Sequence, residues 1–405
     1  MFDEKAYQIL TENIMPFWDK LRDDEFGGFY GQMDNDLVLD KKGTKGVILN
    51  SRILWFYSQS AIVLKKIYEE ELDGNSGKLA KHALDQAEHA YRFLMEHCLD
   101  REQGGVYWMM NYDGSVNDSM KHTYNQAFAI YALSTYYLAG GEKAALDTAF
   151  ELFDTVESKC TDDIAYMEAF DRNWQLIEND ALSENGLMAD KTMNTVLHLI
   201  EAYTVLYKAS GEKKVADRLR FLLDITDRKI YDHENKKLLV FFDRELNVIG
   251  DIHSYGHDIE ASWLIDRACD VLGDEKLRAK WEDLDLDIVD NIMKVAYEEG
   301  DGTASLKNER DGDKINTKRI WWVQAEAVVG LVNAFMHDFD PDHLLAAEKI
   351  LAWIEEYQTD KRCGEWFAEV DENGKLIPGV TIVNEWKCPY HNGRMCLELL
   401  SRHTH

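Results

Sequence analysis

Apolar residues recur at intervals of three and four along most of this 405-residue chain, which is the spacing of one face of an α-helix. Only four prolines occur in the whole sequence, so they leave long stretches free to be helical. The pattern predicts a protein that is mainly α-helical.

Six segments break the helical pattern at similar intervals. Most of them alternate aromatic and polar residues around an Asn, Asp or Gly turn, which is typical of a short β-ribbon. Their starts lie about 60 to 77 residues apart, a period that accommodates a helical hairpin and its connection. The segments are GGFYGQMDNDLVL from Gly27, GGVYWMMNYDGSV from Gly104, IAYMEAFDRNWQLI from Ile164, LLVFFDRELNVI from Leu238, GTASLKNERDG from Gly302 and GEWFAEVDENGKLI from Gly364.

Each ribbon leads into a helix that is apolar on nearly every side, as expected of a helix buried in the wall of a core. We expect these six inner helices to begin near Ser51, His122, Lys191, Gly256, Lys318 and Pro389. The first five are followed by more amphipathic helices, which we expect to lie outside: KLAKHALDQAEHAYRFLMEH, KAALDTAFELFDTVES, KVADRLRFLLDITDRKI, KLRAKWEDLDLDIVDNIMKVAY and HLLAAEKILAWIEEYQ.

The two ends of the chain offer a way to close the ring. The sixth inner helix runs into the C-terminus without an outer partner, whereas the N-terminal segment AYQILTENIMPFWDKL is amphipathic. We therefore predict an all-α (α/α)6 barrel with short β-ribbons in the connecting loops, forming one catalytic domain over residues 1–405. An open helical solenoid would have the same period, but it would usually show more repeats and atypical capping ends.

Charge and composition exclude several classes of function. The formal net charge of −30 would repel a phosphate backbone, so we expect no nucleic-acid partner. Asp3, Glu4 and Lys5 stand where a secretory signal would need a basic start and an apolar run, and no uninterrupted apolar stretch approaches a membrane span of about 20 residues.

The six cysteines show no C-x-x-C, which fits free thiols. We expect a cytoplasmic protein with no membrane partner.

Unusual residues stand at the same place in every repeat, the start of the inner helix. Consecutive members lie about 63 to 72 residues apart, so a closed ring brings all six helix starts to one mouth. A bowl lined by aromatic residues and a few convergent polar groups is the expected form of a small-molecule pocket. The six positions are Arg52, Tyr124, Asn194, His257, the pair Trp321 and Trp322, and His391.

Two inner helices carry further polar residues at helical spacing. Asp190, Asn194 and His198 are four residues apart and are expected to lie along one stripe of the third inner helix. Glu260 follows His257 by three residues, so its carboxylate is expected to orient that imidazole. A purely structural role is the alternative for a single histidine such as His198.

Aromatic and acidic residues complete the candidate site. The fifth inner helix contributes Trp321, Trp322 and Glu326, and the segment before the last helix contributes Trp386. Indole rings at a pocket mouth are suited to serve as flat platforms under sugar rings. We expect at least one of the three tryptophans to contact the substrate.

Several of these segments resemble those of one enzyme family. SRILWFYS, KTMNTVLHLIEAYT, SYGHDIEASWL, RIWWVQAE and EWKCPYHNGRM are similar to the corresponding segments of cellobiose 2-epimerases, within the N-acylglucosamine 2-epimerase superfamily, and the resemblance spans nearly the whole chain. It implies the (α/α)6 fold, no cofactor, and catalytic roles for His257 and His391. It also implies that the reducing-end sugar is surrounded by Arg52, Asn194, His198, Glu260, Trp322 and Trp386.

The chemistry of this resemblance suits the residues. Inverting C2 of the reducing-end glucose of a β-1,4-linked disaccharide requires ring opening, removal of the proton next to the aldehyde, and return of a proton to the other face of a planar enediolate. Histidine, with a pKa of about 6.5, exchanges protons at neutral pH, so His257 and His391 are predicted to flank C2. Arg52 is expected to stabilise the enediolate oxygen and His198 to assist ring opening. The remaining candidates for substrate contact are Tyr124, Asp190, Asn194, Glu260, Trp321, Trp322, Glu326 and Trp386.

Other functions could use parts of the same residue set. An aldose–ketose isomerase, or an N-acylglucosamine- or mannose-type epimerase of the same superfamily, would need nearly the same groups. A sugar-binding protein without catalysis would need only the aromatic platforms. An inverting glycosidase would need two carboxylates across a scissile bond, with Asp190, Glu260 and Glu326 as candidates. A metal site would use His198, His257 and His391.

We expect no metal, a small-molecule disaccharide as the partner, and a monomer.

Overall fold

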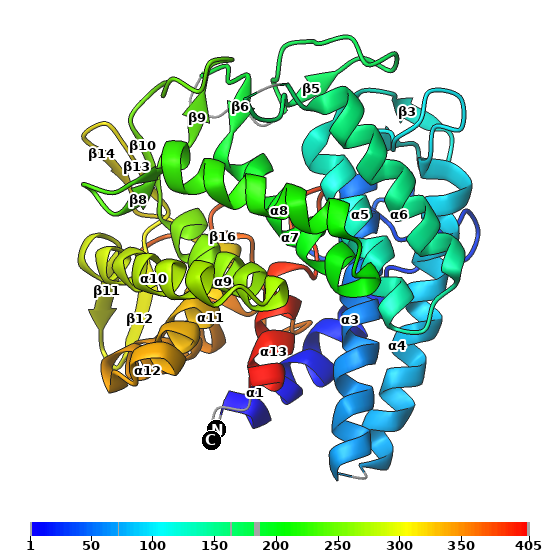
Figure 1. The fold of residues 1–405 in the computed structure, drawn as a ribbon. Coiled ribbons are helices and arrows are strands. Elements are labelled where there is room, and N and C mark those ends of the chain that lie inside the picture. The colour runs from blue at the N-terminus through cyan, green and yellow to red at the C-terminus, as the bar shows by residue number, and fades with distance from the viewer. Residues whose placement is uncertain (1, 72, 163, 182–186, 403–405) are drawn as a thin grey trace.

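The helices form an inner and an outer layer around a common axis (Figure 1). The computed structural model describes residues 2–71, 73–162, 164–181 and 187–402. The inner layer consists of α3 (Val47–Glu71), α5 (Thr123–Leu138), α7 (Met193–Ser210), α9 (Tyr255–Leu272), α11 (Trp321–Asp338) and α13 (His391–Arg402).

The outer layer covers the inner helices, and most of its members end in a π-helical turn. It begins with α1 (Phe2–Gln8), which continues through η1 (Ile9–Ile14) into α2 (Met15–Asp19). The other outer helices, each with its turn where it has one, are α4 (Gly74–Phe93) with η2 (Leu94–Cys98), α6 (Lys143–Thr155) with η3 (Val156–Cys160), α8 (Lys213–Ile225) with η4 (Thr226–Ile230), α10 (Glu275–Val295), and α12 (Pro341–Trp353) with η5 (Ile354–Gln358).

The inner helices close into a ring. Each packs against the next from α3 to α13, and α13 in turn packs against α3. Helix α1 and the turn η1 lie against α13, so the beginning of the chain covers its last inner helix (Figure 1). The predicted (α/α)6 barrel is confirmed, and the open solenoid is wrong because α13 contacts both α11 and α3.

Short antiparallel strand pairs join neighbouring repeats at one end of the ring. The strand before an inner helix pairs with the ribbon of the following repeat: β1 (Lys45–Gly46) with β2 (Met109–Met110), β4 (Lys121–His122) with β5 (Ala169–Phe170), β6 (Lys191–Thr192) with β9 (Phe241–Phe242), β10 (Ile252–Ser254) with β13 (Glu309–Asp311), and β15 (Arg319–Ile320) with β16 (Glu369–Val370). A single bridge between Met33 and Val383 joins the last loop to the first ribbon. The loops therefore close in the same order as the helices.

The remaining strands lie within or beside the ribbons: β3 (Val116–Asp118), β7 (Tyr231–Asp232), β8 (Lys237–Leu238), β11 (Tyr297–Gly300), β12 (Thr303–Leu306) and β14 (Lys314–Asn316). The predicted starts of the inner helices lie within four residues of the observed ones. The third begins at Met193 rather than Lys191 because Lys191 and Thr192 pair as β6, and the Thr192 hydroxyl accepts a hydrogen bond from Thr195 N as the helix cap.

Burial explains the apolar character of α3. Among the described residues, this helix alone is long and apolar enough to match a membrane span, with a mean hydropathy of 1.2 over its most apolar window. Within the ring, 89% of that window is buried. Packing between α4, α5 and α13 therefore accounts for its composition.

Close packing of α9 on α11 should make Gly330 sensitive to substitution. A Cβ at this position would lie 2.5 Å from Ile259 Cγ1 and 2.9 Å from the Ile259 carbonyl oxygen, which is main chain and cannot rotate away. Alanine favours a helix by about 1 kcal/mol over glycine, but the clash should outweigh this gain, so Gly330→Ala is expected to lower the free energy of unfolding by about 1–3 kcal/mol. Urea denaturation measures the change.

Gly74→Ala is the matched control, since nothing lies within 4 Å of a Cβ placed there at the start of α4. This variant should be as stable as the parent chain or slightly more stable. Equal stability of the two alanine variants would contradict the close contact between α9 and α11.

Candidate active site

The inner helices begin around one cavity of about 240 Å³. Ten of the twelve residues that the sequence pointed to line this cavity, so helix starts that are far apart in the chain meet as expected. Together with Ala181, the lining residues are Arg52, Tyr124, Asn194, His198, His257, Glu260, Trp321, Trp322, Trp386 and His391.

Two of the lining histidines are oriented by buried glutamates through Nδ1. His391, the first residue of α13, has Nδ1 2.8 Å from Glu326 Oε1 on α11. His198 on α7 has Nδ1 2.9 Å from Glu201 Oε2, one helical turn along the same helix. In both imidazoles Nε2 is left without a hydrogen-bond partner among the described residues, and it is therefore the nitrogen available to a substrate.

His257 is held by a different residue from the one predicted. Its Nδ1 lies 2.7 Å from Ser254 Oγ, at the end of β10. Glu260, three residues further along α9, was expected to hold this imidazole. That prediction is wrong, because Glu260 makes no direct hydrogen bond to His257 among the described contacts. Glu260 Oε1 instead accepts a hydrogen bond from Nη2 of Arg394 on α13, since a buried guanidinium offers the carboxylate a full opposite charge.

Burial keeps two of these imidazoles neutral. It lowers the pKa of His257 to about 4, although the nearby Glu260 carboxylate acts in the opposite direction. Burial also holds the pKa of His391 well below its ordinary value, and the positive charges of Arg394 and Arg52 add to the effect. At neutral pH both rings are therefore unprotonated, and each has a lone pair that can accept a proton.

A buried guanidinium forms another part of the wall. Arg52 is 3% exposed, and its Nη2 donates a 2.8 Å hydrogen bond to the Tyr124 hydroxyl, while Nη1 donates to the Trp386 carbonyl at 3.3 Å. Its central carbon lies 4.2 Å from the ring centroid of Phe128 and 4.7 Å from that of Tyr390. Arg52 Nε has no partner among the described residues. A fixed positive charge thus lies where a developing negative charge on a substrate could be stabilised.

Two of the tryptophans contact the histidines of the cavity. The Trp322 ring centroid is 4.7 Å from that of His257 and 5.4 Å from that of His391, so this indole contacts both imidazoles. Trp321 is 8% exposed and meets His391 edge to face at 6.2 Å, whereas Trp386 is half-buried in the loop before α13. Trp322 and Trp386 are therefore more exposed than Trp321, and all three line the cavity.

Asp190 is not among the described residues that line the cavity. Its Oδ1 lies 3.2 Å from Nε of Arg244, in an exposed ion pair. The predicted stripe assumed helical geometry from Asp190 onwards, but α7 begins only at Met193, so the four-residue spacing is helical between Asn194 and His198 alone.

Glu326 also lies behind the cavity wall rather than in it. Its side chain is fully buried, its Oε2 accepts a 3.0 Å hydrogen bond from Trp263 Nε1, and its Oε1 contacts His391 and Arg394. It therefore contacts His391 directly and is not among the described residues that line the cavity.

Three buried residues that contact the cavity lining, Glu201, Tyr390 and Arg394, were not among the predicted site residues. Arg394 donates from Nη1 to Glu201 Oε1 at 2.6 Å and from Nη2 to Glu326 Oε1 at 2.7 Å, and Tyr390 donates to Glu201 Oε2 at 2.5 Å. Glu201 had a usable signal, because it follows His198 at the same spacing as Glu260 follows His257. An arginine inside the last helix carried no comparable signal, since its partners come from three other helices.

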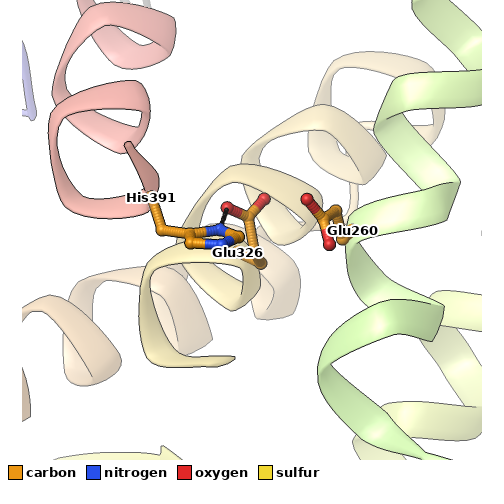
Figure 2. Close-up of side chains that lie close together, drawn as sticks. All are labelled: Glu260, Glu326 and His391. Carbon is orange, nitrogen blue, oxygen red and sulfur yellow. Dashed lines mark hydrogen bonds and ion pairs between the residues drawn. The ribbon is translucent and has the colours of Figure 1, made fainter. Parts of the chain in front are cut away.

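Glu260, Glu326 and His391 converge from α9, α11 and α13 (Figure 2), with one donor atom of each within 4.8 Å of the others. Carboxylate and imidazole groups are common metal ligands. Here, however, Arg394 Nη2 contacts an oxygen of both glutamates and supplies the positive charge that a cation would bring. We therefore assign the cluster to the orientation of His391.

Comparisons with known proteins agree with this geometry. Residues 27–392 match the family model of N-acylglucosamine 2-epimerase. The chain is 54% identical to a cellobiose 2-epimerase of Ruminococcus albus, covering 99% of both chains. Among solved structures, it matches a sugar epimerase from a ruminal bacterium (TM-score 0.94, 52% identity, 100% of both chains) and the cellobiose 2-epimerase of Bacillus thermoamylovorans (TM-score 0.91, 42% identity, 99% of both chains). The resemblance seen in the sequence is confirmed, and the chain belongs to the N-acylglucosamine 2-epimerase family.

Proposed function

We propose that this chain is a cofactor-independent sugar epimerase that inverts C2 of the reducing-end glucose in β-1,4-linked disaccharides, converting cellobiose to glucosyl-mannose and lactose to epilactose. The observation that supports this reaction is the placement of two neutral imidazoles, those of His257 and His391, on the wall of one cavity and in contact with the same indole. The disaccharide follows from the relatives named cellobiose 2-epimerase, which match the chain over almost its whole length.

The reaction needs one proton acceptor and one proton donor at C2. After the sugar ring has opened, one histidine removes the C2 proton and becomes an imidazolium, while the electron pair moves into an enediolate. The second histidine gives a proton to the opposite face of C2, which inverts the centre. His257 and His391 exchange these roles when the reaction runs in reverse.

Other residues of the cavity have supporting roles in the proposal. Arg52 stabilises the negative enediolate oxygen, because its charge is fixed in place and buried away from bulk water. His198 assists ring opening by exchanging a proton with a ring or anomeric oxygen. Tyr124 and Asn194 bind sugar hydroxyl groups, and Trp322 or Trp386 lies against a sugar ring.

The setting of the enzyme is also part of the proposal. We infer that residues 1–405 act as one catalytic domain and that the protein is a monomer in the cytoplasm. All six cysteines are free thiols in the structure, and five of them are buried, which suits a reducing compartment.

Incubation with cellobiose in heavy water tests the reaction. The product should be glucosyl-mannose carrying deuterium at C2, because the second histidine, which delivers the new proton to C2, exchanges its N–H with the solvent. NMR spectroscopy and mass spectrometry of the product measure both changes. Accumulation of a ketose would favour an aldose–ketose isomerase, and release of free glucose would favour a glycosidase; either as the main product would contradict the proposal.

Substitution of the two histidines tests their roles. His257→Asn and His391→Asn should each lower kcat by about 10²- to 10⁴-fold or more, the usual contribution of a positioned acid or base, while disaccharide binding is largely retained. His233→Asn is the control, since this exposed histidine lies on the loop after β7. Epimerisation at the parental rate in both active-site variants would rule out the two-histidine model.

The acidity of His257 should set the acid limb of the pH profile. A base must be unprotonated, and the pKa of His257 is lowered to about 4, so it stays competent until the pH falls toward 4. We expect kcat/KM to hold through pH 6.5 and to fall only below about pH 5. Circular dichroism at each pH separates this titration from unfolding, and a limb centred near 6.5 would contradict the burial of this imidazole.

A further inference from the structure

We infer that Arg394 is a positioning residue that gives His198 and His391 opposite tautomers, so that His198 presents a lone pair on Nε2 and His391 presents an N–H on Nε2. The inference rests on the proposed function for its catalytic consequence but not for the tautomers themselves. It follows from the different surroundings of the two glutamates that Arg394 contacts.

Glu201 is surrounded by donors. Its Oε1 accepts from Arg394 Nη1 at 2.6 Å and from the Tyr390 hydroxyl at 2.7 Å, and its Oε2 accepts from Tyr390 at 2.5 Å. Burial alone would raise the pKa of Glu201, but Arg394 and His198 overcome that effect and lower it to about 2. An ionised Glu201 can only accept, so a proton of His198 lies on Nδ1, facing this carboxylate, and the neutral tautomer that this contact selects has its lone pair on Nε2.

Glu326 must share its cation with another carboxylate. Arg394 Nη2 lies 2.7 Å from Glu326 Oε1 and also contacts Glu260 Oε1, so two buried glutamates compete for one nitrogen. Glu260 Oε2 has no hydrogen-bond partner among the described residues. Counting Glu201, three buried carboxylates surround one guanidinium, and three negative charges against one positive charge are unfavourable in a buried site.

The uncompensated charge is relieved by a proton on Glu326. Burial raises the pKa of Glu326 to about 8, and the neighbouring Glu260 adds to this effect although Arg394 opposes it. A protonated Glu326 donates to His391 Nδ1 across the 2.8 Å contact, which leaves the proton of the neutral imidazole on Nε2. His391 therefore faces the cavity as a hydrogen donor.

This arrangement supplies the acid that two neutral histidines would otherwise lack. His391 transfers its Nε2 proton to C2 of the enediolate, and Nδ1 takes up the proton of Glu326. His391 stays neutral, Glu326 becomes a carboxylate, and the proton removed from C2 remains on His257. The enzyme leaves this step ready for the reverse reaction, with His257 as the acid and His391 as the base.

Nitrogen NMR of the substrate-free protein, labelled with ¹⁵N-histidine, reports the tautomers without requiring turnover. The parent chain should show a protonated Nδ1 on His198 and a protonated Nε2 on His391. Arg394→Lys keeps the charge but replaces the two-nitrogen contact by a single ammonium, so it should change the nitrogen shifts of both residues while those of His257 stay unchanged. Assignment uses the His198→Asn, His257→Asn and His391→Asn variants.

Glu326→Gln serves as a second variant in case Arg394→Lys does not fold. The glutamine amide can still donate to His391 Nδ1 and preserve its tautomer, but it has no proton to transfer. We expect kcat on cellobiose to fall by about 10²-fold or more with little change in KM. Arg267→Met is the control, because Arg267 pairs with Glu398 and its removal should leave all three histidines unchanged.

The outcomes separate this inference from the proposed function. A proton on Nδ1 of His391 in the parent chain, or unchanged shifts of both histidines in Arg394→Lys, would overturn the role of Arg394. Full kcat in Glu326→Gln would overturn the proton transfer. Absence of epimerisation by the parent chain itself, with the tautomers as stated, would overturn the proposed function and leave the tautomer assignment standing.

Discussion

The contact of α13 with both α11 and α3 is the constraint on which the site depends. Helix α13 is the last element of the barrel; it brings His391 into the cavity lining and Arg394 into contact with the buried glutamates next to that lining. Each of the glutamates that meet Arg394 lies on an earlier helix and would lose its buried cationic partner without it. Closing the ring is therefore also what makes the polar interior tolerable, since breaking a buried ion pair typically costs about 3–5 kcal/mol.

The buried polar network around Arg394 is compatible with stability because its hydrogen bonds are numerous. Glu201 receives donors from a histidine, a tyrosine and an arginine, and Glu326 contacts an indole N–H, an imidazole and the same arginine. Such a network fixes the rotamers of the histidines it contacts, and fixed side chains on helices hold a site more precisely than side chains on loops. Closure of the ring and orientation of the imidazoles are two results of the same contacts.

The periodic part of this structure could be predicted from the sequence, and the part that depends on contacts between repeats could not. The six apolar helices and their ribbons follow from local spacing, and ring closure followed from the unpaired helices at the two ends. The helix starts then placed ten candidate residues around one cavity. The predictions failed where the spacing of residues along one helix was assumed to fix the contacts of a side chain. Glu260 contacts Arg394 on another helix, and Asp190 precedes α7 rather than lying on it.

Because burial makes the histidines weak bases, the proposed reaction depends more strongly on stabilising the enediolate. An imidazole whose pKa is about 4 is always ready to accept a proton at neutral pH, but it is a weak base for a carbon acid, because proton transfer is most efficient when the two acidities are close. For proton transfer to be efficient, the C2 proton of the substrate must therefore become more acidic. In the proposed reaction Arg52 meets this need, since a guanidinium held by Tyr124 and by the Trp386 carbonyl is in place before charge develops on the enediolate. The same burial that weakens the bases also strengthens the attraction between that charge and the oxygen, because the surrounding medium screens it poorly. Burial of these side chains therefore shifts the demand from a strong base to a preorganised electrostatic partner, and Arg52 is as central to the proposed chemistry as the histidines that move the proton.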